Sequence, residues 1–155
     1  MAEIVVGVDG SESSADATRW ALDMGARLGD SVRLVCAFEF PAAWLGMGEA
    51  LGSSVAPSIS TEDLEAYALA SIEEVLARIE IPEGVSVFRE AHPGHPADVL
   101  VQLSADADLL VVGSKGHGDF GSVLLGSVGM HCVHHAQCPV VTMAHPHRRK
   151  HRKAT

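Results

Sequence analysis

Six glycines lie close together in residues 111–129, VVGSKGHGDFGSVLLGSVG, directly after an apolar run that ends at Val112. Glycine loses more backbone freedom on folding than any other residue, so such a cluster needs a physical reason. Gly126 and Ser127 immediately precede an apolar segment that is predicted to be helical. The start of a helix offers free backbone N–H groups and the positive end of the helix dipole, which together suit an anion. The stretch is therefore a candidate phosphate site, and a glycine-rich surface loop without a ligand is the alternative.

Three common motifs do not account for this stretch. Gly116-x-Gly118-x-x-Gly121 has the spacing of the dinucleotide fingerprint, but that fingerprint follows the first strand and needs an acidic residue about 20 positions later. No acidic residue follows Asp119. The chain has no Gly-Lys dipeptide and no G-x-S-x-G, which excludes a Walker P-loop and a serine-hydrolase elbow.

The segments that would position these residues alternate between strands and helices. Strands are predicted at 3–8, 32–38, 85–91, 108–113 and 139–143, and helices at 12–29, 61–80, 96–105 and about 126–136. This order predicts an α/β fold, a Rossmann-like open parallel five-stranded sheet with helices on both faces. Ligands of such sheets bind beyond the C-terminal strand ends, where the strand order reverses. Asp9 and Gly113 both lie at such ends, so we expect them to meet.

Charge and composition describe an acidic body with a basic tail. The 155 residues suggest one domain, and the formal net charge of −9 argues against a general nucleic-acid binder. Five of the eleven basic residues lie within 148–153. We predict a folded domain over 1–143 and a disordered basic tail over 144–155, which we expect to be dispensable for folding and for ligand binding.

The apolar segments and the cysteines bear on the compartment. No apolar run approaches the roughly 18–20 residues that span a bilayer, and MAEIVVGVDG has neither the basic region nor the cleavage pattern of a signal peptide. Cys36, Cys132 and Cys138 do not make a disulfide framework. These features predict a cytoplasmic protein without a membrane partner.

Three quoted segments resemble one known family. Gly113-x-x-Gly116, nine further residues and then Gly126-Ser127 resemble the signature of the universal stress proteins. VVGVDGSESS resembles that family's first strand and turn, ADLLVVGSKGHG its fourth strand and loop, and LLGSVGMHCVHHAQCPVV its last helix and strand. The resemblance implies that a nucleotide's phosphates lie on the glycine stretch. It identifies the chain as an adenine-nucleotide-binding protein of stress or dormancy signalling, with ATP, alone or with Mg²⁺, as the expected ligand.

The resemblance also implies a role for each matching position. Asp9 would accept hydrogen bonds from the ribose hydroxyls, and the backbone near Gly7 and Ala37 would meet the adenine. Gly113 and Gly116 would let the backbone approach the phosphates, and residues 117–119 would flank them. Gly126, Ser127 and Val128 would hold the phosphates at the start of the last helix. The implied site comprises Gly7, Val8, Asp9, Ala37, Gly113, Ser114, Lys115, Gly116, His117, Gly118, Asp119, Gly126, Ser127, Val128 and Gly129.

One position departs from the family pattern. The family usually has Ser or Thr where this chain has Gly129, so the preferred number of phosphates stays open, as does the choice among ATP, AMP and a cyclic nucleotide. Only His117 and Asp119 are candidates for a general base near a γ-phosphate, so we expect no enzyme, and slow ATP hydrolysis is left open. The alternatives are a nucleotide-free scaffold of the same family and an ATP-using nucleotidyl transferase of related architecture.

The last strand and the histidines before it bear on protein partners and metals. The last strand, Pro139–Met143, would leave an apolar sheet edge exposed, and family members often pair this strand, so we expect a homodimer through it. His131 and His135 have an i, i+4 spacing that metal sites use, with His134 nearby. No second ligand segment is evident, so no metal site is predicted. Trp44, in the long segment 41–58, would either cover the nucleotide or bury a single aromatic ring.

Overall fold

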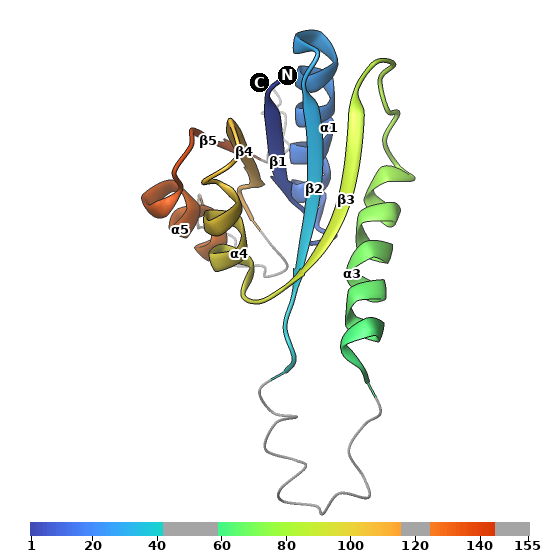
Figure 1. Ribbon diagram of the computed structural model, residues 1–155, viewed down its shortest axis with the longest axis vertical. Coiled ribbons are helices and arrows are strands. Elements are labelled where there is room, and N and C mark those ends of the chain that lie inside the picture. The colour runs from blue at the N-terminus through green and yellow to red at the C-terminus, as the bar shows by residue number, and fades with distance from the viewer. Residues whose placement is uncertain (42–58, 116–124, 145–155) are drawn as a thin grey trace, which may run out of the picture.

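A computed structural model describes residues 1–41, 59–115 and 125–144 of the chain. Its centre is one five-stranded sheet in the order β3-β2-β1-β4-β5, in which every neighbouring pair of strands is parallel (Figure 1). The strands are β1 (Glu3–Gly7), β2 (Ser31–Phe38), β3 (Ser86–Pro93), β4 (Leu109–Gly113) and β5 (Val140–Met143). The predicted α/β fold with a parallel five-stranded sheet is confirmed.

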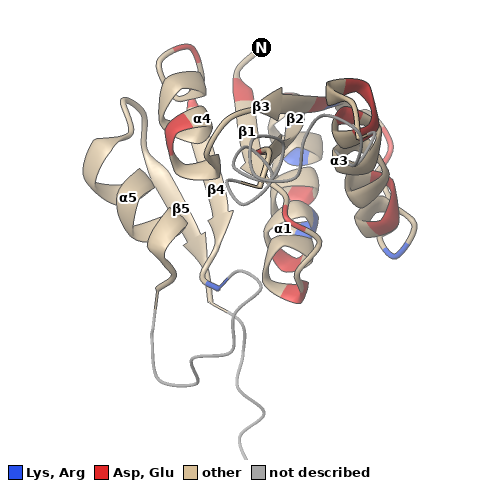
Figure 2. Ribbon diagram, turned by 90° about the horizontal axis from the view of Figure 1, so that it is seen from below, with Lys and Arg blue, Asp and Glu red and all other residues tan. Residues whose placement is uncertain are grey.

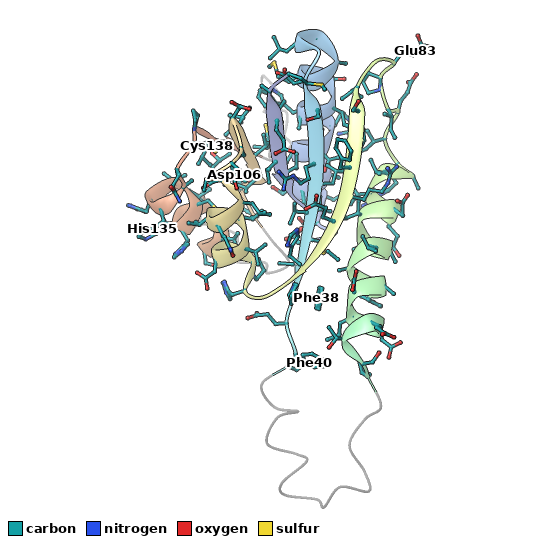
Figure 3. All side chains as sticks on the ribbon, viewed as in Figure 1. Phe38, Phe40, Glu83, Asp106, His135 and Cys138 are labelled. Carbon is teal, nitrogen blue, oxygen red and sulfur yellow. The ribbon has the colours of Figure 1, made fainter. Side chains whose placement is uncertain are left out.

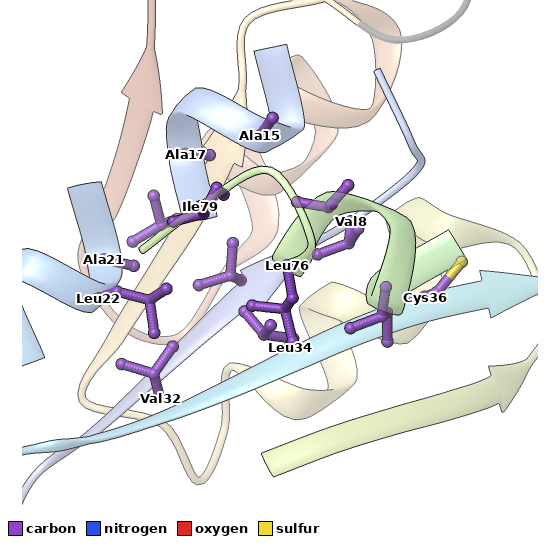
Figure 4. Packing of buried hydrophobic residues seen from close by; sticks show 14 of the residues in the cluster. Val8, Ala15, Ala17, Ala21, Leu22, Val32, Leu34, Cys36, Leu76 and Ile79 are labelled. Carbon is purple, nitrogen blue, oxygen red and sulfur yellow. The ribbon is translucent and has the colours of Figure 1, made fainter. Parts of the chain in front are cut away.

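Helices cover both faces of this sheet because buried strands carry apolar side chains on both sides. On one face, Ile4 and Val6 of β1 pack in a core with residues of α1 (Glu12–Leu28) and α3 (Thr61–Leu76). Figure 4 shows this core closely. On the other face, Val5 packs with residues of α4 (Pro96–Leu103) and α5 (Ser127–His135). Alternate residues of one strand thus fill two separate cores.

Local chemistry sets most of the helix boundaries. The Ser11 hydroxyl accepts a hydrogen bond from the Ser14 N–H at 3.2 Å and caps α1, which ends at Gly29 in the left-handed region, with φ of 74°. The predicted helix over 61–80 is four residues too long, because α3 ends at Leu76. The Ile79 N–H there donates to the Leu76 carbonyl, and this tighter turn brings Ile79 into the core.

The sheet order creates a switch point between β1 and β4. Val6 of β1 pairs with Leu34 of β2 on one side and with Val111 of β4 on the other. The chain passes from β1 through α1 to β2 and then outward to β3, whereas β4 is followed by β5 at the opposite edge. The connections that follow β1 and β4 therefore leave in opposite directions, and a crevice opens between their C-terminal ends.

Charge is spread unevenly over the described residues, which contain 18 Asp and Glu and 6 Lys and Arg. Figure 2 marks Asp and Glu positions along α1 and α3 and no Asp, Glu, Lys or Arg on α5 or β5. No helix within the described ranges is both long enough and apolar enough to cross a membrane. The predicted loop over 41–58 and the basic tail lie almost entirely outside the described residues.

Candidate functional site

A pocket opens at the switch point, between the C-terminal ends of β1 and β4 and the start of α5. It brings together residues that lie more than 100 positions apart in the sequence. Ten of the fifteen residues that the sequence predicts for the site line it: Gly7, Val8, Asp9, Ala37, Gly113, Lys115, Gly126, Ser127, Val128 and Gly129.

Asp9 follows β1 and is held in place by the start of α1. Its Oδ1 accepts hydrogen bonds from the Ser11 N–H at 2.9 Å and from the Ser11 hydroxyl at 2.5 Å. The Asp9 N–H lies 3.4 Å from the Ser14 Oγ. Asp9 is exposed and lines the pocket, so hydroxyl groups of a ligand could reach its carboxylate. The hydrogen bonds from Ser11 hold that carboxylate in one orientation.

The end of β4 is joined to β5 and α5 by backbone hydrogen bonds through Ser114. The Ser114 N–H donates to the Met143 carbonyl at 2.9 Å, and the Ser114 carbonyl accepts from the Gly126 N–H at 2.6 Å. Ser114 is itself buried, with its Oγ 3.5 Å from that of Ser13. It does not line the pocket, unlike the other described residues predicted for the site, and its place is that of a structural link.

Gly113 has no room for a side chain, and the reason lies in α1. A Cβ on Gly113 would lie 2.5 Å from the Ser13 Oγ and 2.8 Å from the Ser13 carbonyl carbon. Ser13 Oγ also accepts a hydrogen bond from the Lys115 N–H at 3.3 Å. The first turn of α1 therefore packs directly on β4 and fixes the backbone at the pocket floor.

The start of α5 faces the pocket with its backbone donors. Gly126 caps the helix without a side-chain hydrogen bond, and the Met130 N–H donates to the Gly126 carbonyl at 2.9 Å. The N–H groups of Ser127, Val128 and Gly129 belong to the first turn, where a helix has no internal acceptors. This end of the pocket can bind an anion through backbone donors and the helix dipole.

Apolar side chains form another part of the pocket lining. Val35, Leu100, Val112 and Pro96 line the pocket beside Ala37. None of these four residues could be selected from the sequence, because an apolar residue in a predicted strand or helix is typical of the hydrophobic core. Such a wall can hold a flat apolar ring. Next to Ala37, burial first and the charge of Asp9 second raise the pKa of the Cys36 thiol, which disfavours the thiolate.

Five of the residues singled out in the sequence lie outside the described residues, namely Gly116, His117, Gly118, Asp119 and Trp44.

The histidines of α5 lie outside the pocket lining. The rings of His131 and His135 are 4.5 Å apart between centroids, and His131 Nε2 lies 3.6 Å from Asp98 Oδ1. In the described part of the chain, no three His, Cys, Asp or Glu side chains are grouped so that they could hold a metal ion.

Comparison with known proteins gives one consistent answer. The sequence model of the Universal stress protein family matches residues 1–143. The universal stress protein Rv2623 of Mycobacterium tuberculosis is 34% identical over 144 residues, which cover 90% of this chain and 44% of that protein. The chain thus spans about half the length of the first curated relatives it matches.

Two solved structures resemble the chain over nearly its whole length. A universal stress protein in complex with cAMP is 27% identical with a TM-score of 0.63, over 92% of this chain and 95% of that one. The hypothetical protein MJ0577 is 19% identical with a TM-score of 0.72, over 94% and 97%, and this likeness concerns the fold alone. From the family match over residues 1–143, the chain belongs to the universal stress protein family.

Proposed function

We propose that this chain binds an adenine nucleotide, with ATP as its ligand, and acts through the bound nucleotide in stress or dormancy signalling. The observation that carries the proposal is the convergence of three chemically different walls at one switch point. These are the oriented carboxylate of Asp9, the start of α5, which has no side-chain cap, and the apolar residues around Leu100. A relative of 27% identity, described in complex with cAMP, supports an adenine nucleotide as the class of ligand.

Each wall fits one part of such a ligand. The adenine ring would lie against Val35, Ala37 and Leu100, where an apolar surface favours a flat ring. The ribose hydroxyls would donate to Asp9. The phosphates would lie at the N–H groups of the first turn of α5, with the Lys115 ammonium close by. The proposed role is binding, and no catalytic step is assigned to these residues.

Calorimetric titration of the purified protein with ATP, AMP, cAMP and adenosine tests the proposal. We expect ATP to bind to the wild type and binding to be lost in Gly126→Val, because the new side chain crowds the helix start and the phosphates. Asp106→Ala is the matched control for Asp9→Ala, since it removes the same charge from the turn before β4, at the end of the sheet where the strands begin. Figure 3 labels Asp106 there, together with Cys138.

Native mass spectrometry separates the alternatives. A co-purifying adenine nucleotide supports the proposal. A protein that is free of nucleotide and binds none at millimolar ligand is a scaffold of the same family, and ATP-dependent transfer of a nucleotidyl group to an acceptor would instead identify a transferase. Equal ATP affinity of Gly126→Val and wild type would place the nucleotide elsewhere.

A further inference from the structure

Three serines lie at the cap and in the first turn of α1, namely Ser11, Ser13 and Ser14, and we call them the serine turn. They hold the end of β1 through both the side chain and the backbone of Asp9. The Ser11 N–H and hydroxyl donate to Asp9 Oδ1, and the Asp9 N–H lies 3.4 Å from the Ser14 hydroxyl. The Ser14 hydroxyl donates in turn to the Ser11 carbonyl at 3.0 Å. These contacts form a closed ring, so the position of Asp9 depends on the start of α1.

The serine turn also holds the chain just after β4, at Lys115. The Lys115 N–H donates to the Ser13 hydroxyl at 3.3 Å, and the Lys115 carbonyl lies 3.4 Å from the Ser11 hydroxyl. The Ser11 hydroxyl therefore lies between the two strand ends, with Asp9 Oδ1 at 2.5 Å on its other side. A hydroxyl group has one proton to donate, and the shorter contact directs it to Asp9. The carboxylate that would meet the ribose is thus held at a fixed place beside the backbone of Lys115, whose ammonium would lie near the phosphates.

Helix capping alone does not explain the hydrogen bonds of Ser11. α3 begins with a similar cap, in which the Ser60 hydroxyl accepts from the Asp63 N–H at 3.1 Å and donates to Asp63 Oδ2 at 2.9 Å. That carboxylate lies inside the helix, three residues after the cap, as in a capping box. In α1 the same position is occupied by Ser14, and Ser11 instead donates to a carboxylate that precedes the helix and lines the pocket. Ser11 lines the pocket as well, and Ser60 is not among the described residues that do.

We propose that Ser11 is a positioning residue that makes this pocket selective for a sugar with ribose hydroxyls. It acts through Asp9, because its hydroxyl holds the carboxylate where those hydroxyls would donate to it. The inference rests on the proposed function and adds to it the residue that sets the selectivity for the sugar. Without the hydroxyl, the Ser11 N–H remains as the donor from this residue, and the carboxylate is less firmly oriented toward the ligand.

The test compares two ligands by calorimetry, ATP and its dideoxy analogue, which lacks both ribose hydroxyls. In Ser11→Ala the preference for ATP over the analogue should fall by about two- to tenfold, the range expected for one hydrogen bond. A displaced Lys115 backbone would weaken both ligands alike, so the ratio of the two affinities reports on the sugar contact. Ser60→Ala is the matched control, because it removes a serine cap of the same kind from α3. Both variants should be less stable to urea, since each loses a helix cap, but Ser60→Ala should keep the ratio.

Two further variants show whether Ser11 acts through Asp9. Ser11→Thr keeps the hydroxyl and should recover most of the lost preference, and in Asp9→Ala the added Ser11→Ala change should leave the ratio as it is.

Three results would overturn this inference and leave nucleotide binding standing. These are an unchanged ratio in Ser11→Ala, an equal fall of the ratio in Ser60→Ala, and a further fall when Ser11→Ala is added to Asp9→Ala. A wild type that binds no adenine nucleotide would overturn both this inference and the proposed function.

Discussion

Gly113 gives the sharpest test of how the pocket floor is built. In Gly113→Ala the new Cβ would lie 2.5 Å from the Ser13 Oγ, 2.8 Å from its carbonyl carbon and 2.9 Å from its Cβ. The carbonyl carbon is backbone and cannot rotate away, so α1 must move off β4. Overpacking of this kind costs about 1–3 kcal/mol. The lower entropy of the unfolded alanine chain offsets about 0.4–1 kcal/mol of that loss.

At the midpoints of these two ranges the free energy of unfolding is about 1.3 kcal/mol below that of the wild type. For a chain of this size that lowers the Tm by roughly 3–5 °C. Urea unfolding followed by circular dichroism measures the difference directly, provided that the m-value is unchanged.

Gly129→Ala is the matched control, because Gly129 lies next to Gly113 in the same pocket. There the new Cβ would lie 2.7 Å from Leu125 Cδ1, the far end of a flexible side chain that can turn aside. Alanine is also favoured over glycine in a helix, by about 1 kcal/mol in the interior and by less in a first turn such as that of Gly129. The Gly129→Ala variant should therefore be as stable as the wild type or up to about 1 kcal/mol more stable. A Gly113→Ala protein of wild-type stability, or equal losses in both variants, would refute this account of the floor.

Three further predictions follow from other parts of the molecule. Asp9→Ala should weaken adenine-nucleotide binding by about 1.5–3 kcal/mol, roughly tenfold to a hundredfold, because charge-assisted hydrogen bonds to the ribose are lost, and calorimetry against Asp106→Ala measures this. At micromolar concentration the wild type should sediment at twice the chain mass and Val141→Lys as a monomer, because a lysine in the edge strand β5 opposes pairing of that strand. A monomeric wild type would contradict the predicted dimer. Burial first, and the charge of Cys138 second, raise the pKa of the Cys132 thiol from 9.0 to about 11 in the folded protein. The thiol therefore ionises at a lower pH in the unfolded chain than in the folded one. The free energy of unfolding should for this reason fall as the pH rises from about 9 to 11. Cys132→Ala should flatten that part of a pH series of urea unfolding curves, and an unchanged slope would show that other groups cause the loss.

The sequence predicted those parts of the fold that local chemistry determines. Ser11 and Gly29 have the side-chain oxygen and the backbone freedom that begin and end a helix, and α1 has these ends. The predicted end of α3 was wrong because apolar residues recur at helical spacing as far as Ile79. Only the packing of Ile79 against the core shows that the turn tightens after Leu76.

Some residues of the candidate site could likewise be predicted from the sequence, and others could not. Asp9 and Gly113 could be placed together because parallel strands bring their C-terminal ends to one edge. Leu100 could not be selected, since an apolar residue of an amphipathic helix gives no local sign that it borders a pocket. The contact of Ser13 with Gly113 depends on how α1 crosses β4, which no short segment of sequence encodes.

The position of β1 between β2 and β4 has a consequence for the growing chain on the ribosome. Ile4 can pair with Val32 as soon as β2 has been made, but its other neighbour, Leu109, is added only after α3, β3 and α4 have followed. Until then the second edge of β1 offers unpaired N–H and C=O groups to any other extended segment, including those of sister chains. The pocket is likewise incomplete over this period, because Gly113, Lys115 and residues 126–129 line it. A ligand that binds this pocket can therefore stabilise the chain only after residue 129 has been made, and the segments made before it lack that protection until then.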